Sequence, residues 1–325
     1  MNVQNKIHIT MIGPSGVGKT CFMVGMYGLM RDGLRGFTFD AEDPDVDLDL
    51  SNAWEQIRME EGADRWPLPN DHAIREFAFH LRYAYNPISL FRWIDYRGGA
   101  LSAHSSERDV QELREHVRRS DCLCLCVSGE ALAAGHWREA ASQSQAARMS
   151  QLLERVVDGR SGSEKVPVVL VVTKSDLCLR ERGPGEILGY LRDMFSPLFA
   201  PGGRWLVAVC PVTLGSELAE STDTGAIAPV GIHLPVVFAI YAHLRRAREE
   251  RGQGVQDLRK ALGGLSGGWL RSWWFKEERE GVDEELQRAL AEQGVLEDRL
   301  DLLGQEIDGH GLEVYHDGQR VELDT

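Results

Sequence analysis

The chain contains 325 residues, carries a formal net charge of −14 and is 43% hydrophobic. This length and composition suit one large folded domain with an appendage, and they exclude a largely disordered chain. The negative charge repels phosphate backbones and so disfavours nucleic acid as a partner. The lack of any uninterrupted apolar run of about 18 residues excludes a membrane-spanning helix.

Apolar strand patterns alternate with helical patterns along most of the chain. In chain order, we expect a strand at residues 6–12, a helix at 21–31, strands at 74–83 and 89–95, a helix at 106–119, a strand at 122–128, a helix at 137–157, a strand at 166–172, a helix at 186–195, a strand at 205–210 and a helix at 234–250. The run at 166–172 is almost wholly apolar, which is typical of a parallel strand buried on both faces. The alternation predicts a doubly wound α/β domain.

An insert separates the first predicted helix from the second predicted strand. It covers about residues 36–72 and is expected to be irregular, with an acidic stretch at 40–49 and a short helix near 52–61. The two strands that follow it are expected to be joined through Asn86 and Pro87, which are typical turn residues.

The composition changes after the last of these helices, so the sequence predicts a main domain over residues 1–250 and an appendage over 251–325. The appendage contains a cluster of large aromatic side chains beside Arg271 and Lys276. Its members are Trp269, Trp273, Trp274 and Phe275. Three interpretations stay open: packing against the main domain, a surface for a protein partner, or a membrane-interface anchor, which the negative charge disfavours.

A helical pattern at residues 283–307 follows, and a hairpin at 311–323 is expected to turn at Asp317-Gly318. A stripe runs along this helix at alternating three- and four-residue steps, the pattern of a short coiled coil. The stripe comprises Leu286, Ala289, Gln293, Leu296, Leu300, Leu303 and Ile307. A helix of this length is marginal alone, so we expect it to pack against the main domain or against another chain.

Three of the six cysteines alternate along the predicted strand at 122–128. Cys122, Cys124 and Cys126 therefore lie on one face of that strand, where Cys packs as a small apolar residue. A metal site is the alternative, but a flat row on one strand cannot surround a metal ion by itself. We expect packing, in a reducing cytoplasmic setting.

Residues 13–20 match the phosphate-binding motif G-x-x-x-x-G-K-[ST], between a predicted strand and a predicted helix. Glycines there permit backbone angles that aim N–H groups inward, and the helix N-terminus adds its dipole. Lys19 would reach the β- and γ-phosphates, and the Thr20 hydroxyl would bind Mg²⁺. The alternative is a glycine-rich turn that binds nothing, which the complete motif disfavours. The expected phosphate contacts come from Gly13, Ser15, Gly16, Val17, Gly18, Lys19, Thr20 and Cys21.

A second motif begins at Asp95, at the end of a predicted strand, and continues through Arg97 and Gly98. Beside a phosphate-binding loop, such a carboxylate is expected to hold Mg²⁺ through water, and Gly98 to donate its N–H to the γ-phosphate. The alternative is an ordinary Asp in a strand-end turn. Lys19, Gly98 and Arg97 are the candidate catalytic residues.

The third motif, T-K-x-D, spans residues 173–176, directly after the most apolar strand, and it resembles the guanine-reading [N/T]-K-x-D motif of P-loop GTPases. The Asp176 carboxylate would accept hydrogen bonds from the N1–H and 2-amino groups of guanine, a pattern that adenine does not present. The Lys174 stem would lie along the base. A strand-end N-cap is the alternative. The expected base contacts come from Thr173, Lys174, Asp176, Val212 and Thr213.

With these motifs in this order, residues 5–250 resemble a Ras-like, translation-factor-class GTPase domain, and more closely the bacterial double-GTPase type of conflict and signalling gene clusters. The resemblance is carried by the phosphate-binding loop and T-K-x-D, and more loosely by Trp66-Pro67 and residues 93–99. It implies GTP or GDP with Mg²⁺ as ligands, a mixed sheet with one antiparallel edge hairpin, and a regulatory role exercised through loops that sense the γ-phosphate.

Two positions depart from the Ras-like pattern. Gly99 stands where the resemblance places a water-orienting Gln, and Asn70 stands near the place of the switch Thr that binds Mg²⁺. An Asn carbonyl is a weaker metal ligand. Arg97, His104 and Arg31 are candidates to assist hydrolysis. Nucleotide binding is therefore better supported than hydrolysis.

The sequence thus predicts a GTP-binding molecular switch that hydrolyses GTP slowly and regulates a protein partner. The partner, or a second copy of the chain, is expected to bind through residues 251–325, and an activating protein is a further expected partner. Two alternatives stay open: a nucleotide-bound scaffold without turnover, and an ATP-dependent enzyme of the P-loop class. The T-K-x-D motif disfavours the second.

Overall fold

The computed structural model describes residues 6–67, 74–96, 107–158, 165–265 and 276–323. Within them, one nine-stranded sheet has the order β2-β3-β4-β1-β5-β6-β7-β8-β9. Its strands are β1 (Ile7–Ile12), β2 (Phe37–Ala41), β3 (Ile74–Tyr83), β4 (Asn86–Tyr96), β5 (Cys122–Ser128), β6 (Val166–Thr173), β7 (Trp205–Pro211), β8 (Glu313–His316) and β9 (Gln319–Val321).

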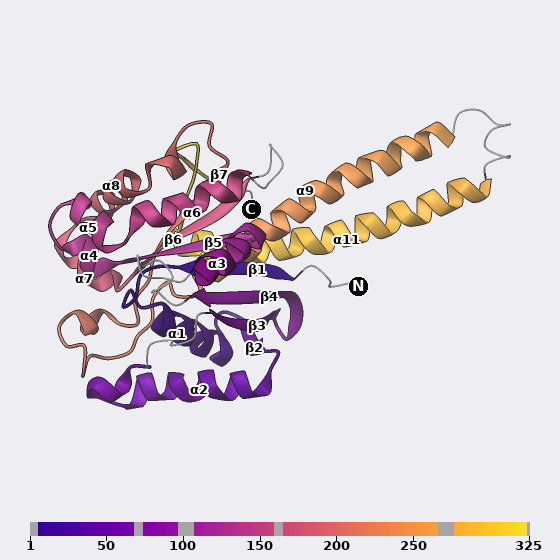
Figure 1. Cartoon of the computed structure of the whole chain (residues 1–325). Coiled ribbons are helices and arrows are strands. Elements are labelled where there is room, and N and C mark those ends of the chain that lie inside the picture. Colours follow the sequence, from indigo (N-terminus) through magenta and orange to yellow (C-terminus); the bar gives the residue numbers. More distant parts are fainter. Residues whose placement is uncertain (1–5, 68–73, 97–106, 159–164, 266–275, 324–325) are drawn as a thin grey trace.

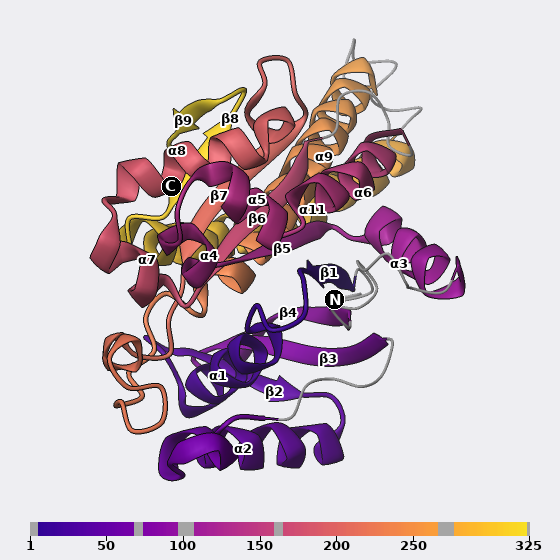
Figure 2. The same ribbon diagram turned by 60° about the vertical axis from the view of Figure 1, so that its left-hand side comes forward.

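Helices cover both faces of this sheet (Figures 1 and 2). They are α1 (Lys19–Asp32), α2 (Pro44–Met59), α3 (Glu107–Arg119), α4 (Gly129–Ala133), α5 (Trp137–Gln143), α6 (Ala146–Asp158), α7 (Ser175–Glu181), α8 (Pro184–Met194), α9 (Leu234–Leu265) and α11 (Lys276–Gly309). One core lies between the sheet and α1, α2, α9 and α11, and a second lies between the opposite face and α3, α5, α6 and α8. Within the described ranges, none of these helices has the length and apolarity needed to cross a membrane.

The centre of the sheet is parallel, as the sequence predicts. Strands β4, β1, β5, β6 and β7 run in one direction, and every residue of β6 is buried. The expected antiparallel hairpin is present at one edge, where β3 pairs with both β2 and β4. A second antiparallel pair, β8 and β9, extends the other edge beyond β7. The doubly wound α/β fold is therefore confirmed, with one antiparallel edge more than expected.

The insert at residues 36–72 is more regular than the sequence suggested. Its first residues form β2 at the edge of the sheet, and a helix of 16 residues, α2, replaces the short one expected near 52–61. The Asp43 side chain caps this helix by accepting a hydrogen bond from the N–H of Asp45 at 2.9 Å, and Pro44 fits its first turn. Trp54 packs so closely on α1 that a Cβ at Gly28 would lie 2.1 Å from the indole ring.

The prediction is also wrong about one turn and about one helix. The turn between β3 and β4 is Ala84-Tyr85, with φ angles of 46° and 64°, rather than Asn86-Pro87, which begin β4. The single helix expected at 137–157 is divided into α5 and α6 at Gln145, whose φ is 53°. Non-glycine residues seldom adopt positive φ, so neither break carries the usual Gly or Asn signal.

The residues after position 250 are part of the same fold, whereas the sequence predicted a boundary between two parts at that position. That position lies within α9, and α9 and α11 lie side by side as a long helical hairpin (Figure 1). Leu296, Leu300, Leu303 and Ile307 of the predicted stripe are buried in the core against the sheet. The main domain therefore supplies the second surface that this stripe needs. The aromatic cluster at 269–275 lies outside the described residues.

The terminal hairpin turns at Asp317-Gly318 as predicted, with φ angles of 52° and 71°. Its first strand, β8, pairs with β7 from Leu206 to Val209. Residues after position 250 therefore complete the sheet that carries the phosphate-binding loop.

We predict that Leu303→Ala will lower the free energy of unfolding by about 2–5 kcal/mol, because Leu303 is fully buried and its truncation leaves a cavity. Denaturant unfolding of the full chain measures this, with Val295→Ala as the control, since Val295 on the same helix is 42% exposed. Equal stability of the two variants would mean that α11 is not part of the core.

Candidate functional site

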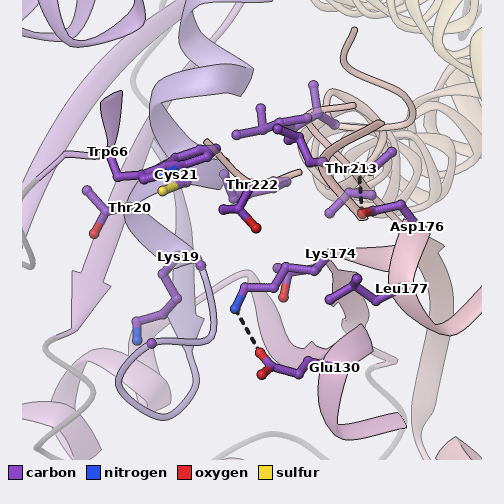
Figure 3. A pocket seen from close by; sticks show the side chains of 18 of the residues that line it. Lys19, Thr20, Cys21, Trp66, Glu130, Lys174, Asp176, Leu177, Thr213 and Thr222 are labelled. Carbon is purple, nitrogen blue, oxygen red and sulfur yellow. Dashed lines mark hydrogen bonds and ion pairs between the residues drawn. The ribbon is translucent and has the colours of Figure 1, made fainter. Parts of the chain in front are cut away.

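The three sequence motifs meet at one edge of the sheet. Strands β1, β4 and β6 are parallel, so their carboxyl ends lie along the same edge of the sheet, where the described parts of the three motifs are found. A cavity of about 480 Å³ opens there, lined by residues of all three motifs (Figure 3). Among the predicted contacts, those that line it are Ser15, Gly16, Gly18, Lys19, Thr20, Cys21, Asp95, Thr173, Lys174, Asp176, Val212 and Thr213.

The phosphate-binding loop needs its glycines for two different reasons. Gly16 and Gly18 have φ angles of 76° and 94°, which side chains with a Cβ rarely adopt. Gly13 instead allows close packing, since a Cβ there would lie 2.9 Å from the Cβ of Cys126. Gly13 and Val17 belong to the loop but do not line the cavity. Helix α1 begins directly after Gly18.

Lys19 places a cation inside this loop. Its ammonium group donates to the carbonyl oxygens of Gly13 at 2.8 Å and Pro14 at 3.0 Å, and the residue is only 7% exposed. Burial lowers the pKa of Lys19 from its ordinary value, while the nearby Asp95 carboxylate raises it. A desolvated ammonium group held by two neutral carbonyls is well placed to attract phosphate oxygens.

Asp95 and Thr20 provide hard oxygen donors beside the phosphate-binding loop. Asp95 is 2% exposed at the end of β4, in register with Met11 of β1, and both Asp95 and Thr20 line the cavity. A carboxylate and a hydroxyl beside a phosphate site are the ligands that Mg²⁺ uses in proteins. The residues present therefore fit a magnesium ion.

Thr173 joins the base-side motif to the phosphate-binding loop. Its hydroxyl donates to the carbonyl oxygen of Val17 at 2.5 Å, and its side chain is buried. The next residue, Lys174, has a φ of 49° and turns the chain into α7. A Cβ at Gly129 would lie 2.1 Å from the Lys174 carbonyl oxygen, so that glycine is needed for the turn to fit.

Asp176 is held at the far end of the cavity. The residue is 9% exposed, and the Thr213 hydroxyl donates to its Oδ1 atom at 2.7 Å (Figure 3). Val212, one position earlier, is fixed between β6 and α7 because its N–H donates to Val172 and its carbonyl accepts from Ser175. The weak sequence signal after β7 thus lies beside the T-K-x-D motif.

The residues that follow β7 form a long loop, 212–232, which we name the base-side loop. Thr213 and Val230 pair at its two ends, and Leu214, Leu218, Thr222 and Ile232 line the cavity. Arg65, at the end of the insert, anchors the loop by donating to the carbonyl oxygens of Gly225 at 2.9 Å and Ile57 at 2.9 Å. The insert therefore helps to shape the cavity.

Several lining residues were not assigned to the site from the sequence. Trp66 and Pro67 line the cavity from the end of the insert, although in the sequence they only loosely supported the family resemblance. Glu130, in the first turn of α4, pairs with Lys174 at 3.1 Å (Figure 3). Their contribution depends on long-range packing, so no local pattern identifies it.

Three predicted site residues, Asn70, Arg97 and Gly98, lie outside the described residues, as does His104. Arg31 is not a lining residue of the cavity. It pairs instead with Asp47 of α2 at 3.2 Å, which places it in the contact between α1 and α2.

The geometry defines a P-loop nucleotide-binding protein whose base-side motif is of the guanine-reading type. The family model named Double-GTPase 2 matches residues 7–200, which is more than half of the chain. The protein therefore belongs to the Double-GTPase 2 family and is a GTP-binding protein of the P-loop GTPase class.

Other comparisons are more distant. Among curated proteins, none matches this chain. Among solved structures, the signal recognition particle receptor SRb-GTP/SRX complex from Chaetomium thermophilum is similar at 16% identity and a TM-score of 0.36, covering 65% of this chain and 91% of that chain.

Replacing Lys19 by Ala is expected to weaken GTP binding at least tenfold without unfolding the chain. The variant loses the buried cation, and a charge-assisted hydrogen bond contributes about 1.5–3 kcal/mol. Titration with a fluorescent GTP analogue measures the affinity, and circular dichroism checks the fold. Lys260→Ala is the control, since Lys260 is exposed on α9. Unchanged affinity in Lys19→Ala would contradict the phosphate site.

Proposed function

We propose that this protein is a GTP-dependent molecular switch that binds Mg²⁺-GTP, hydrolyses it slowly and regulates a protein partner. The observation that carries the proposal is the Asp176 carboxylate, fixed by Thr213 in the cavity that also contains Lys19. One end of this cavity suits a guanine base and the other suits a di- or triphosphate.

Base selection follows from the chemistry of the Asp176 carboxylate. An ionised carboxylate only accepts hydrogen bonds, and guanine offers two adjacent donors, N1–H and the 2-amino group. Adenine lacks that pair. The Thr213 hydroxyl occupies one site on Oδ1 and restrains the orientation of the carboxylate, so less ordering is needed when the base binds.

The Lys174 side chain is placed to complete the base site. Its backbone has the left-handed conformation, and its side chain lines the cavity. There its ammonium group pairs with Glu130. This pair holds the aliphatic stem across the cavity, where it can cover one face of the base. Trp66, another lining residue, offers an aromatic surface to the same ligand.

Magnesium is the second proposed ligand, held by Thr20 and Asp95. When bound, it would neutralise phosphate charge and so favour transfer of the γ-phosphoryl group to water. The protein side of that chemistry is positioning: Lys19 binds the β- and γ-phosphates, and the backbone N–H groups after Gly16 orient them.

Slow hydrolysis is proposed because the sequence offers no side chain at Gly99 to orient the attacking water. An activating protein that supplies an Arg would provide the missing charge. A switch also acts on a partner protein, and we propose that residues 251–325 bind this partner. In this region α9 and α11 extend beyond the sheet (Figure 1).

Asp176→Asn is predicted to weaken GTP binding at least tenfold and to improve binding of xanthosine triphosphate. The amide can donate a hydrogen bond where the carboxylate only accepted, and one charge-assisted bond contributes about 1.5–3 kcal/mol. Competition titrations measure both affinities. Asp257→Asn, an exposed change on α9, is the control. A variant that keeps the wild-type preference for GTP would disprove the assignment of Asp176 to the base site.

The isolated protein should turn GTP over at a rate on the order of 10⁻³ s⁻¹ or below, and a partner that donates an Arg should raise this about 10³–10⁵-fold. A single-turnover assay with radiolabelled GTP measures the intrinsic rate. Complete absence of hydrolysis would support a scaffold instead of a switch. Fast turnover by the chain alone would show that one of its own residues positions the water.

A further inference from the structure

Three side chains with metal-ligating atoms lie together where the base-side loop leads into α9 and where α11 ends. His233 follows the base-side loop and immediately precedes α9, while Glu306 and His310 lie near the end of α11. Each residue offers one ligand atom, and these three atoms all lie within 4.8 Å of one another. Residues far apart in the sequence thus converge on one point.

The contacts within the cluster centre on the Glu306 carboxylate. Its Oε1 atom lies 2.9 Å from Nε2 of His233 and 3.4 Å from Nδ1 of His310. The two imidazole rings meet edge to face, with centroids 4.9 Å apart. The ligands of a tetrahedral zinc ion lie about 3.3 Å apart when the metal–ligand distance is about 2.0–2.1 Å. Nδ1 of His310 also lies 2.9 Å from the carbonyl oxygen of Glu306, so coordination of an ion would need a rotation of that ring together with small rotations of the other two side chains.

Burial makes this cluster different from an exposed group of polar residues. The side chains of His233 and Glu306 are 4% and 5% exposed, while that of His310 is 24% exposed and gives solvent access. In the part of the chain that the structure describes, Nδ1 of His233 is buried and has no hydrogen-bond partner. Buried polar atoms usually have one, so this ring lacks an interaction that a bound ion could supply through a change of ring orientation.

The charges are compatible with a divalent cation. A neutral imidazole keeps one lone pair for a metal ion, and His233 and His310 each offer one ring nitrogen to the cluster. Glu306 supplies one negative charge. Arg35 lies 3.6 Å from Oε2 of Glu306, but its side chain is 57% exposed and can turn towards solvent. The donor set is two nitrogens and one oxygen, which favours zinc over magnesium or calcium.

We propose that His233, Glu306 and His310 bind one divalent transition-metal ion of the zinc class, with water in a fourth position. On binding, the lone pair of the neutral His233 ring would face the ion in place of the N–H that faces Glu306, so the ring would turn over or its proton would move to the other ring nitrogen. It would also fasten the base-side loop to α11, because Ile232, the neighbour of His233, lines the nucleotide cavity. This site is separate from the proposed magnesium site at Thr20 and Asp95.

The test uses the full chain, stripped with a chelator and titrated with Zn²⁺ against a competing metal indicator. We expect one equivalent to bind and the melting temperature to rise, because the ion binds only the folded arrangement. Co²⁺ should bind to the same site and give a spectrum without a thiolate charge-transfer band, which separates this site from the six cysteines. A thiolate band, or no saturable binding, would overturn the proposal.

Two variants locate the ion. Glu306→Gln keeps the shape of the side chain, and His310→Gln changes a partly exposed residue, so both should fold; each should weaken Zn²⁺ binding at least tenfold. His80→Gln on β3 removes an imidazole outside the cluster and is the matched control. Affinity that is unchanged in both cluster variants, or lost equally in His80→Gln, would show an adventitious ion only. Because the readout is metal affinity, the result does not depend on GTP binding.

Discussion

The buried ammonium group of Lys19 is the constraint on which the nucleotide site depends. Removing a cation from water is costly unless oxygen atoms surround it, and here the carbonyls of Gly13 and Pro14 supply them. The loop can present those carbonyls only because its glycines permit positive φ angles and close packing against β5. A phosphate that enters the loop meets a fixed charge, and no large rearrangement is needed.

The rest of the site is held in place from this loop outwards. Thr173 bonds to Val17, so the end of β6, which leads into the helix that contains Asp176, is attached to the phosphate-binding loop by a buried hydrogen bond. Asp176 is in turn attached to the base-side loop through Thr213, and Arg65 holds that loop against the insert. The phosphate-binding loop, the base-side loop and the insert therefore form one connected framework.

Contiguous motifs were the part of this architecture that the sequence could predict. The phosphate-binding loop, the T-K-x-D motif and the turn at Asp317-Gly318 depend on short runs whose residue types have direct physical consequences. The turn at Ala84-Tyr85 could not be predicted, because neither Ala nor Tyr is a residue type that usually adopts a positive φ. Helix α2 is longer than predicted because the acidic stretch at its start does not by itself indicate a helix. Trp66 lines the cavity only through packing over long distances in the sequence. The C-terminal residues show the same limit, because a helix stripe predicts that a helix must pack but does not identify the surface against which it packs.

Selectivity of the cavity for guanine can be measured by equilibrium competition on the wild-type chain. Unlabelled GDP and ADP compete with a fluorescent GDP analogue in the presence of Mg²⁺. Two charge-assisted hydrogen bonds to Asp176 predict that GDP binds at least about 100-fold more tightly than ADP. Equal displacement by the two nucleotides would contradict this account.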